Sequence, residues 1–448
     1  MTEPTTRQLK LGAILGGVGM DQTSWQDPDL PGTASIDIDW YIEQTRKAEA
    51  SKFDFVFIVD SPFITANTAP HYLNRLEPLT LLSALAVATS HIGLVGTLTT
   101  SYWEPYNVAR QFGSLDNISK GRAGWNVVTT GLEGAARNYG REEHFDHKVR
   151  YARAQEFVEV VQGLWDSYED DAFPRDKLAG VFLDKAKQHR LDHNGEFFSV
   201  AGPLALSRSR QGHPVIFQAG DSNEGRDLGA AIAEATFAAP EDYEAAQAYY
   251  ADLKARAASR GRDPDLVTVL PVLNPVIAET DDEAEAIVAQ RQQHLDIHKL
   301  LAHVGRAFNY HDFTQYDLDA PFPELSGITL NSYKSVAEKI IRISREEQLT
   351  LREAAYRFGY LRNTFAGSPQ TIADEMERWF VERAADGFNL QVSRPRDFAL
   401  FRDRVIPLLR ARGLFRKDYS HSTLRGHLGL PVPANRWASV AEPALETA

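Results

Sequence analysis

Short apolar segments alternate with helical segments along almost the whole chain. The segments expected to form strands are nearly continuous in apolar residues, as in residues 53–59 (FDFVFIV). Such strands are typical of a parallel sheet whose two faces are both covered by helices. Eight of them can be counted, and they lie near residues 9, 53, 91, 123, 214, 235, 267 and 388. The pattern predicts an α/β fold of the (β/α)8 TIM-barrel type, with a doubly wound open sheet as the alternative.

The chain has 448 residues, which exceeds the typical barrel of about 250 residues. The excess falls at about residues 168–212 and 280–365. We expect a single barrel domain spanning residues 1–448, with both insertions over the C-terminal face of the barrel, which holds the site. The tail from Tyr419 contains several Pro and Gly residues, and we expect it to wrap around the surface.

Composition excludes several classes of function. The net charge of -13 argues against nucleic acid or an anionic membrane surface as the partner. The absence of cysteine excludes disulfides, thiolate zinc sites, thiol nucleophiles and iron–sulfur clusters. The sequence shows neither a signal-peptide core nor an apolar run long enough to span a membrane, so we expect a cytoplasmic protein.

Residues 121–130 (GRAGWNVVTT) form the fourth expected strand, and polar residues follow its apolar part. Ligands of a barrel bind at the C-terminal ends of the strands. Asn126, Thr129 and Thr130 would offer neutral hydrogen-bonding groups there, without a charge or an evident nucleophile. Such groups position a ligand more readily than they cleave a bond. A core strand with incidental polar ends is the alternative.

Other strand ends supply further candidates. Asp60 follows the second strand, and Thr97 lies at the end of the third. Residues 218–222 (QAGDS) lead from a strand into a helix, where backbone N–H groups and the Ser222 hydroxyl would point at an anion. A simple N-cap explains Ser222 equally well. Asp221 would repel a phosphate unless its side chain points away.

His147 and Tyr151 are four residues apart at the start of an expected helix, so they share one face of it. An imidazole and a phenol suit a phosphate or a polarised ring. The alternative is a surface histidine beside a core tyrosine.

Several other patterns do not make a site. Residues 16–19 (GGVG) match neither a dinucleotide fingerprint nor a P-loop, which favours a flexible loop. No serine stands in a GxSxG elbow. Two histidine groups lack a complete metal-ligand pattern, so we predict no metal site. These groups are His294, His298 and His303, and His144, Asp146 and His147 with Asp192 and His193.

With residues 121–130 on the fourth strand, the chain resembles a group of flavin-dependent monooxygenases related to bacterial luciferase. The group includes nitrilotriacetate monooxygenase component A, pristinamycin synthase and dibenzothiophene-sulfone monooxygenase. The similar segments follow one another in order over most of the chain, so their combination is more specific than any single motif. They are residues 53–60, 92–110, 115–130, 138–140, 151–165, 192–203, 211–222, 316–325 and 385–390.

The resemblance implies a luciferase-like barrel that binds FMN without a covalent bond. It implies a two-component monooxygenase that uses FMNH2 and O2 to oxygenate a small organic substrate through a C4a-peroxyflavin. A separate NAD(P)H:flavin reductase would supply the FMNH2, and homo-oligomers are usual in the group. The cofactor-binding residues would be Asp60, Thr97 and Asn126 around the isoalloxazine and ribityl chain, with His147, Tyr151 and Ser222 around the ribityl chain and phosphate.

The chain also departs from the group. Relatives often carry Trp-Arg-His in the substrate-facing loop after the first strand, where this chain has Trp25-Gln26-Asp27. This difference predicts an altered substrate, which the sequence does not identify. Arg352, Arg357 and Arg362 could meet an anionic substrate, although solvated helix positions explain them better.

Three functions compete with the monooxygenase. They are a deazaflavin- or nicotinamide-linked dehydrogenase on the same barrel, a non-enzymatic flavin carrier and a metal-dependent hydrolase. His147 and His294 are the candidates for an acid or base, but the catalytic residues stay unassigned.

Overall fold

Eight parallel strands form a closed barrel in the computed structural model, in the order β1-β12-β9-β8-β7-β4-β3-β2. This confirms the predicted (β/α)8 barrel. The structure describes residues 7–293, 295–325, 333–360, 365–392 and 394–438. The barrel strands are β1 (Lys10–Leu15), β2 (Phe55–Ile58), β3 (Gly93–Thr99), β4 (Ala123–Val128), β7 (Val215–Gln218), β8 (Ala235–Ala238), β9 (Thr268–Leu273) and β12 (Gly387–Val392).

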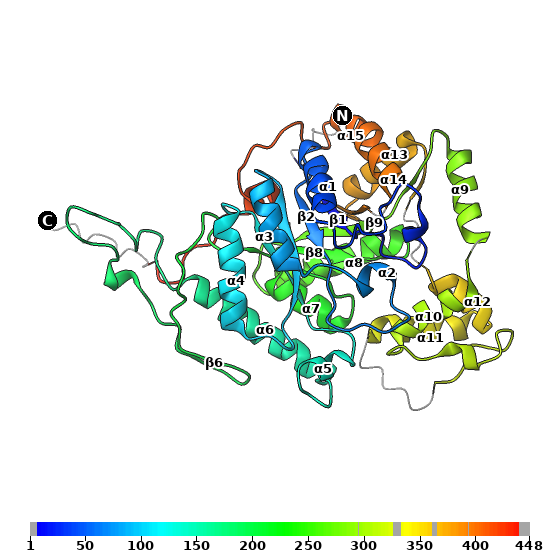
Figure 1. The fold of residues 1–448 in the computed structure, drawn as a ribbon, viewed down its shortest axis with the longest axis horizontal. Helices are drawn as coiled ribbons and strands as arrows, with labels where there is room; N and C mark the ends of the chain where they lie inside the picture. Colours follow the sequence, from blue (N-terminus) through cyan, green and yellow to red (C-terminus); the bar gives the residue numbers. More distant parts are fainter. Residues whose placement is uncertain (1–6, 294, 326–332, 361–364, 393, 439–448) are drawn as a thin grey trace.

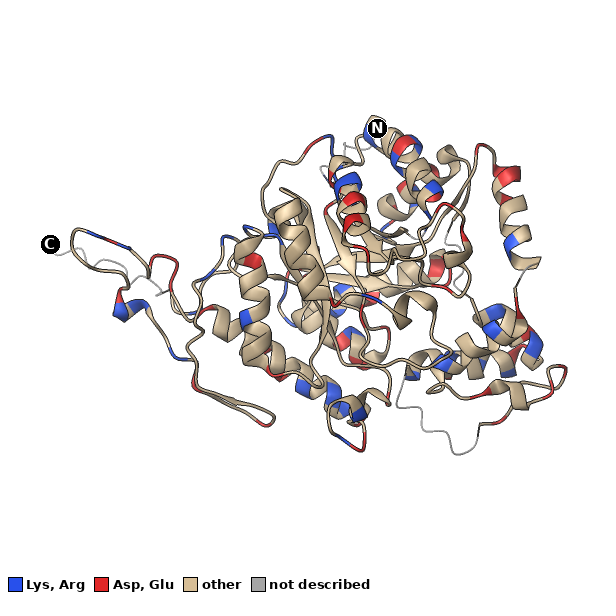
Figure 2. Cartoon of the chain, in the orientation of Figure 1, with Lys and Arg blue, Asp and Glu red and all other residues tan. Residues whose placement is uncertain are grey.

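Helices cover the outside of the barrel (Figure 1). Pro78 and Pro105 occupy the first turns of α3 and α4, where their missing N–H groups leave no hydrogen bond unmade. Lys and Arg are interspersed with Asp and Glu on the outer helices (Figure 2). The covering helices are α1 (Ile38–Ala50), α3 (Pro78–Ala88), α4 (Pro105–Ile118), α6 (His147–Trp165), α7 (Asn223–Ile232), α8 (Tyr243–Ser259), α13 (Pro369–Val381), α14 (Pro395–Leu400) and α15 (Ile406–Ala411). Within the described ranges, no helix is both long and apolar enough to cross a bilayer.

One predicted strand is divided in two. The strand expected near residue 267 is β9, which ends at Leu273, and the short β10 (Val276–Ile277) then leaves the barrel to pair with β11 (Ala366–Gly367). Pro275 stands between β9 and β10. Its missing N–H suits a break between two ladders, although Pro271 within β9 shows that a proline alone does not end the strand.

The barrel interior changes from apolar to polar along its axis. Phe55, Phe57, Phe217 and Phe237 pack together inside it, with ring centroids 5.1 Å apart for Phe55 and Phe217 and 4.4 Å apart for Phe57 and Phe237. Gly12 makes this possible, because a Cβ there would lie 2.3 Å from the Phe55 ring. The polar side chains lie beyond this aromatic layer, toward the C-terminal ends of the strands.

The C-terminal tail closes the other end of the barrel. The short helix α16 (Leu424–Leu428) lies against the N-terminal ends of the strands, and the Leu424 N–H donates to the carbonyl of Gly121 at 3.0 Å. Leu424, Leu428 and Leu430 are buried in the same apolar cluster as Phe55. The expectation that the tail wraps around the surface was therefore wrong for these residues, since their leucines fill the open bottom of the barrel.

Buried charges at this end are bonded to the tail or to neighbouring loops. The Asp54 carboxylate accepts from the Leu11 N–H at 2.7 Å and pairs with Arg416. Asp116 accepts from the Ala123 N–H at 2.9 Å and from the Gln211 side chain at 2.8 Å. Burial raises the pKa of Asp116 to about 6.

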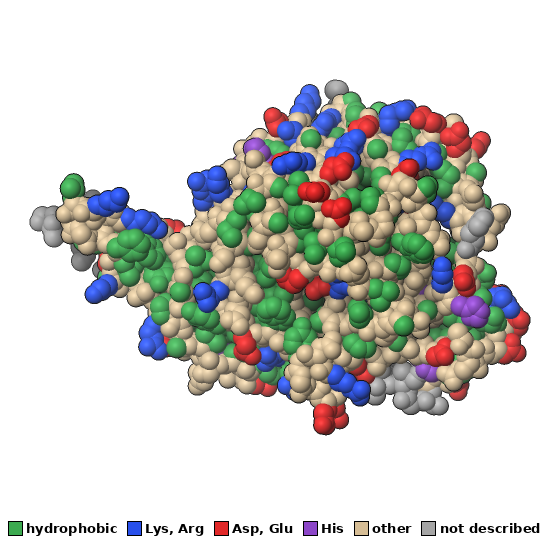
Figure 3. Space-filling view, in the orientation of Figure 1, with side chains coloured by type: hydrophobic (Ala, Val, Ile, Leu, Met, Phe, Trp, Pro, Cys, Tyr) green, Lys and Arg blue, Asp and Glu red, His purple; other side chains and the backbone are tan. Residues whose placement is uncertain are grey.

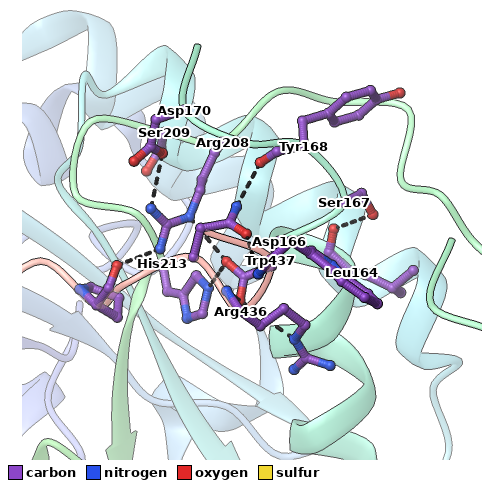
Figure 4. Close-up of polar contacts among 12 residues, drawn as sticks. Leu164, Asp166, Ser167, Tyr168, Asp170, Arg208, Ser209, His213, Arg436 and Trp437 are labelled. Atoms are coloured by element: carbon purple, nitrogen blue, oxygen red, sulfur yellow. Dashed lines mark hydrogen bonds and ion pairs between the residues drawn. The ribbon is translucent and has the colours of Figure 1, made fainter. Parts of the chain in front are cut away.

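The insertion of residues 168–212 also lies at the N-terminal end. Asp166, at the end of α6, accepts from Arg208 at 3.0 Å and contacts His213 at 2.7 Å, so both ends of the insertion meet there (Figure 4). The prediction that this insertion covers the site was wrong for a topological reason. It connects a helix to the start of a strand, and such connections lie opposite the site. Part of it extends from the barrel with exposed apolar side chains, including Leu178 and Phe182 (Figures 1 and 3).

The described parts of the segment 280–365 lie at the C-terminal end of the barrel, where we expected this insertion. Their helices enclose a separate apolar cluster that includes Leu300, Phe308 and Ile340. Arg306 and Tyr333 from this region line a cavity together with barrel residues. The helices are α9 (Asp281–Gln293), α10 (Ile297–Ala307), α11 (Lys334–Glu346) and α12 (Leu351–Phe358).

Candidate active site

A cavity of about 460 Å³ opens at the C-terminal ends of the barrel strands. All six residues predicted to bind the cofactor line it. They come from separate parts of the chain, so their convergence agrees with the strand-end argument. That they bind a flavin stays a prediction. The six are Asp60, Thr97, Asn126, His147, Tyr151 and Ser222.

Side-chain amides at the cavity are only partly bonded. The Asn126 Nδ2 donates to Thr97 Oγ1 at 3.0 Å, but Asn126 Oδ1 is buried without a partner in the part of the chain that the structure describes. The Oδ1 and Nδ2 of Asn389 and the Oε1 of Gln391 are likewise buried without a hydrogen-bond partner among the described residues. A buried polar group without a partner costs about 1–3 kcal/mol, so several of them around one cavity indicate a polar ligand.

Sequence reasoning missed Asn389 and Gln391. A signal was present, because both alternate with apolar residues along β12, and alternate residues of a barrel strand face inward. Thr129 and Thr130 also line the cavity, as expected from the end of the fourth strand.

Asp60 does not present an isolated charge to the cavity. Its carboxylate accepts from the Nε of Arg75 at 2.9 Å, and the Arg75 guanidinium lies 4.9 Å from the ring centroid of Tyr72. The positive charge of Arg75 offsets the negative charge of Asp60, so this side of the cavity is nearly neutral.

The loop before α7 has the form expected of an anion site. Ser222 is the N-cap of α7, and its Oγ accepts from the Gly225 N–H at 3.0 Å. The N-cap interpretation is therefore correct, and the hydroxyl proton of Ser222 is left to donate to a ligand. Gly220 lies close to the first turn of α7, since a Cβ there would lie 2.9 Å from the backbone Cα of Gly225. Asp221 pairs with Arg226 at 2.7 Å, which reduces its repulsion of an anion.

His147 and Tyr151 lie on one face of α6, with ring centroids 4.9 Å apart. The His147 Nδ1 is buried and has no hydrogen-bond partner among the described residues; the nearest carboxylate, Glu224, lies 3.9 Å away. Burial, and after it the charge of Arg150, lowers the pKa of His147. A neutral imidazole can therefore form a hydrogen bond with a ligand at neutral pH.

Arg150 and His144 hold the loop after β4. Thr130 has a left-handed φ of 51°, and its carbonyl accepts from Arg150 and from His144 Nε2, the latter at 3.0 Å. Tyr102 bonds the other ring nitrogen of His144. Burial lowers the pKa of His144 to about 4, so this histidine is a neutral support for the loop.

The other histidines of the rejected metal groups lie apart. His193 bonds Glu156 at 2.9 Å, and His298 is exposed. His294 lies outside the described residues.

A second cavity of about 420 Å³ adjoins the first, and Gln391 lines both. Gln26 and Asp27, which differ from the residues expected from the related monooxygenases, line this second cavity. Asp27 lies 3.8 Å from Arg394 there. His303 lines it as well, and burial lowers its pKa to about 4.

The arginines singled out from the sequence lie elsewhere. Arg352 pairs with Asp319 at 2.8 Å on the surface, Arg357 pairs with Glu347, and Arg362 lies outside the described residues. The arginine of this region that lines the first cavity is Arg306, which sequence reasoning missed.

Comparison with known proteins agrees with this architecture. N-acetyl-S-(2-succino)cysteine monooxygenase of Bacillus subtilis (strain 168) is 44% identical, over 96% of this chain and 99% of that protein. Nitrilotriacetate monooxygenase component A of Aminobacter aminovorans is 42% identical, over 98% of this chain and 99% of that protein. A solved structure of riboflavin lyase with modified FMN and riboflavin is similar with a TM-score of 0.85 and 30% identity, covering 96% of this chain and 97% of that one.

The sequence model of the luciferase-like monooxygenases matches residues 22–387, which is most of the barrel. These matches confirm the resemblance drawn from the sequence. The chain belongs to the luciferase-like monooxygenase family and is a flavin-dependent monooxygenase.

Proposed function

We propose that the protein uses FMNH2 and O2 to insert one oxygen atom into a small organic substrate, with a C4a-peroxyflavin as the oxygen donor. One observation carries the proposal: a single cavity at the barrel mouth combines six predicted flavin contacts with several unpaired amide atoms. An isoalloxazine has a polar edge of carbonyl and N–H groups, which matches amides that can both donate and accept.

The two ends of the cavity suit the two ends of FMN. Asn126, Asn389 and Gln391 would hold the polar edge of the ring. Ser222 and Tyr151 would hold the phosphate end, because the N-terminus of α7 offers unpaired N–H groups and the positive end of the helix dipole.

The protein contributes binding, orientation and exclusion of water, while the flavin supplies the oxygen chemistry when it is bound. Phe57 and Phe237 form an apolar floor under the cavity, and residues 280–365 contribute to its wall from outside the barrel. Keeping water out protects a reactive oxygen donor from hydrolysis.

We also propose that a separate NAD(P)H:flavin reductase supplies the FMNH2. The support is the name of a 42% identical relative, which is one component of its monooxygenase. The main alternative is a deazaflavin- or nicotinamide-linked dehydrogenase on the same barrel.

Anaerobic titrations with FMNH2, riboflavin and a deazaflavin test the assignment. We expect FMNH2 to bind. Riboflavin, which lacks the phosphate, should bind at least about 10-fold more weakly, since charge-assisted hydrogen bonds contribute about 1.5–3 kcal/mol. A flavin reductase with NADH should then support incorporation of ¹⁸O from O2 into a substrate. Suitable substrates are N-acetyl-S-(2-succino)cysteine and dimethyl sulfide, a charged and a neutral thioether. Binding of the deazaflavin in place of FMNH2 would reject the proposal and favour the dehydrogenase.

A further inference from the structure

Arg306 on α10 is a charged side chain that lines the first cavity and has few bonds of its own. Its Nη2 donates to the Tyr333 hydroxyl at 3.0 Å, and its Nε is buried with no hydrogen-bond partner in the described ranges. No carboxylate of the described residues lies within ion-pair distance of it. Several donors of the guanidinium are therefore available to a ligand.

Three tyrosines surround this guanidinium. It lies 5.2 Å from the ring centroid of Tyr333 and 5.6 Å from that of Tyr72. The hydroxyl of Tyr333, followed by those of Tyr72 and Tyr310, raises the pKa of Arg306 against the effect of burial. The side chain is thus a permanent cation that is held in place by aromatic rings.

Other buried arginines of the protein bond groups of the chain itself, either a carboxylate or, for Arg122 and Arg150, backbone carbonyls. Arg208 bonds Asp166 at 3.0 Å, and Arg416 and Arg425 pair with Asp54 and Glu234. A buried charge without a counterion is strongly unfavourable. Arg306 lines a cavity large enough for a ligand and, among the described residues, bonds the Tyr333 hydroxyl but no carboxylate, so an anion from outside the chain can supply the missing charge.

We propose that Arg306 binds a carboxylate of the substrate, and hence that the protein acts on an anionic organic molecule. The inference rests on the proposed function, which places FMN in the same cavity. A planar guanidinium with several donors matches the two oxygens of a carboxylate.

The position of Arg306 separates it from the proposed phosphate site. Arg306 lies over Tyr72, whose ring also contacts Arg75, the partner of Asp60 after β2. Ser222 follows β7, and β3 and β4 lie between β2 and β7 in the barrel. The cation therefore lies toward the ring end of the cavity, where the substrate must meet the flavin.

Calorimetric titration of the enzyme loaded with oxidised FMN tests the proposal without turnover. The probe is N-acetyl-S-(2-succino)cysteine, which carries three carboxylates. We expect Arg306→Gln to weaken its binding about 10- to 100-fold, because a hydrogen bond to a charged group contributes about 1.5–3 kcal/mol. The affinity for FMN should stay within about 2-fold.

Two further variants complete the design. Arg306→Lys keeps the charge but loses the planar fork, so the probe should bind with intermediate affinity. Arg345→Gln is the matched control, because the Arg345 side chain is 66% exposed on the neighbouring α11, and it should bind the probe like the wild type. Circular dichroism checks that each variant is folded.

The outcomes are distinguishable. Equal weakening of probe and FMN by Arg306→Gln would assign the residue to the flavin and overturn the proposal. Unchanged probe binding would overturn it as well, and so would a wild-type enzyme that oxygenates dimethyl sulfide but does not bind the probe. If the probe binds through Arg306 but no ¹⁸O is incorporated, the proposed monooxygenase function fails while the anion site stands.

Discussion

At the N-terminal end of the barrel, the buried Asp54 carboxylate meets Arg416 and a backbone N–H, whereas at the C-terminal end both amide atoms of the buried Asn389 lack a partner among the described residues. The first end is filled by leucines of α16, and the second holds a cavity of about 460 Å³. Within the described ranges, single nitrogen atoms of Arg416, Arg425 and His427 also lack partners at the filled end, but each of these side chains makes other hydrogen bonds.

The contrast separates stability from binding within one barrel. Polar side chains at the filled end form hydrogen bonds within the chain and stabilise the fold. Under the proposed function, the unpaired amide atoms at the open end are satisfied when a ligand binds, so the fold gives up stability there in exchange for binding. Substitutions at the two ends should therefore change different measurable quantities.

The largest expected effect is at the filled end. Arg416→Met leaves the buried Asp54 carboxylate without its cation, which should lower the free energy of unfolding by about 3–5 kcal/mol. Urea denaturation measures the loss, and the affinity for FMN in the remaining folded protein should not change. Lys417→Met removes the adjacent exposed cation and serves as the control. A similar loss in both variants would contradict the role of the buried pair.

Asp116 gives a smaller effect with a definite pH dependence. Burial raises its pKa to about 6 from 3.8, so the folded state holds the proton more tightly than the unfolded state. The contribution of Asp116 to stability is therefore largest below pH 4 and is lost as the pH rises to 6, a change of about 3 kcal/mol.

Asp116→Asn removes this titration and can keep the contacts, since its oxygen still accepts from Ala123 and its amide can donate to Ser209. The stability of the variant relative to the wild type should rise between pH 4 and pH 7.5 in urea denaturation. A constant difference between the two proteins over that range would show that burial does not govern this carboxyl.

The smallest effect on stability is expected at the open end. Asn126→Leu removes a buried oxygen that has no partner in the described structure, but it also removes the hydrogen bond from Asn126 Nδ2 to Thr97. Because the two effects oppose each other, the free energy of unfolding should change by no more than about 1 kcal/mol. The affinity for FMN should fall about 10-fold, the equivalent of one hydrogen bond. If the variant instead loses stability and keeps its affinity, the open end is a packed core like the other end.

The barrel could be predicted because its strands are continuous apolar runs. That the six residues predicted to bind the cofactor line one cavity could be expected because barrel ligands lie at strand ends, while their binding of a flavin stays a prediction. The bounds of α1 and the capping role of Ser222 follow from local sequence in the same way. Predictions failed where distant segments decide the outcome. Residues 168–212 are a different case, because the helix expected before them and the strand expected from residue 214 already make them a helix-to-strand connection, which lies opposite the site.

Arg306 and the tail illustrate the same limit. An arginine in a helical segment is solvated unless tertiary packing places aromatic rings around it, as Tyr72 and Tyr333 do here. The leucines of the tail carried a local signal, but the barrel bottom that receives them is built from eight strands distant in sequence.

The position of α16 has a consequence for synthesis of the protein. Leu424 bonds Gly121, which precedes β4, and β12 must pair with the first strand, β1, before the barrel closes. A ribosome that has made the first seven strands therefore carries a sheet with two open edges and no filled bottom. The barrel can be completed only after residues up to about 430 have left the exit tunnel. A nascent chain stalled before that point exposes the apolar interior that chaperones bind.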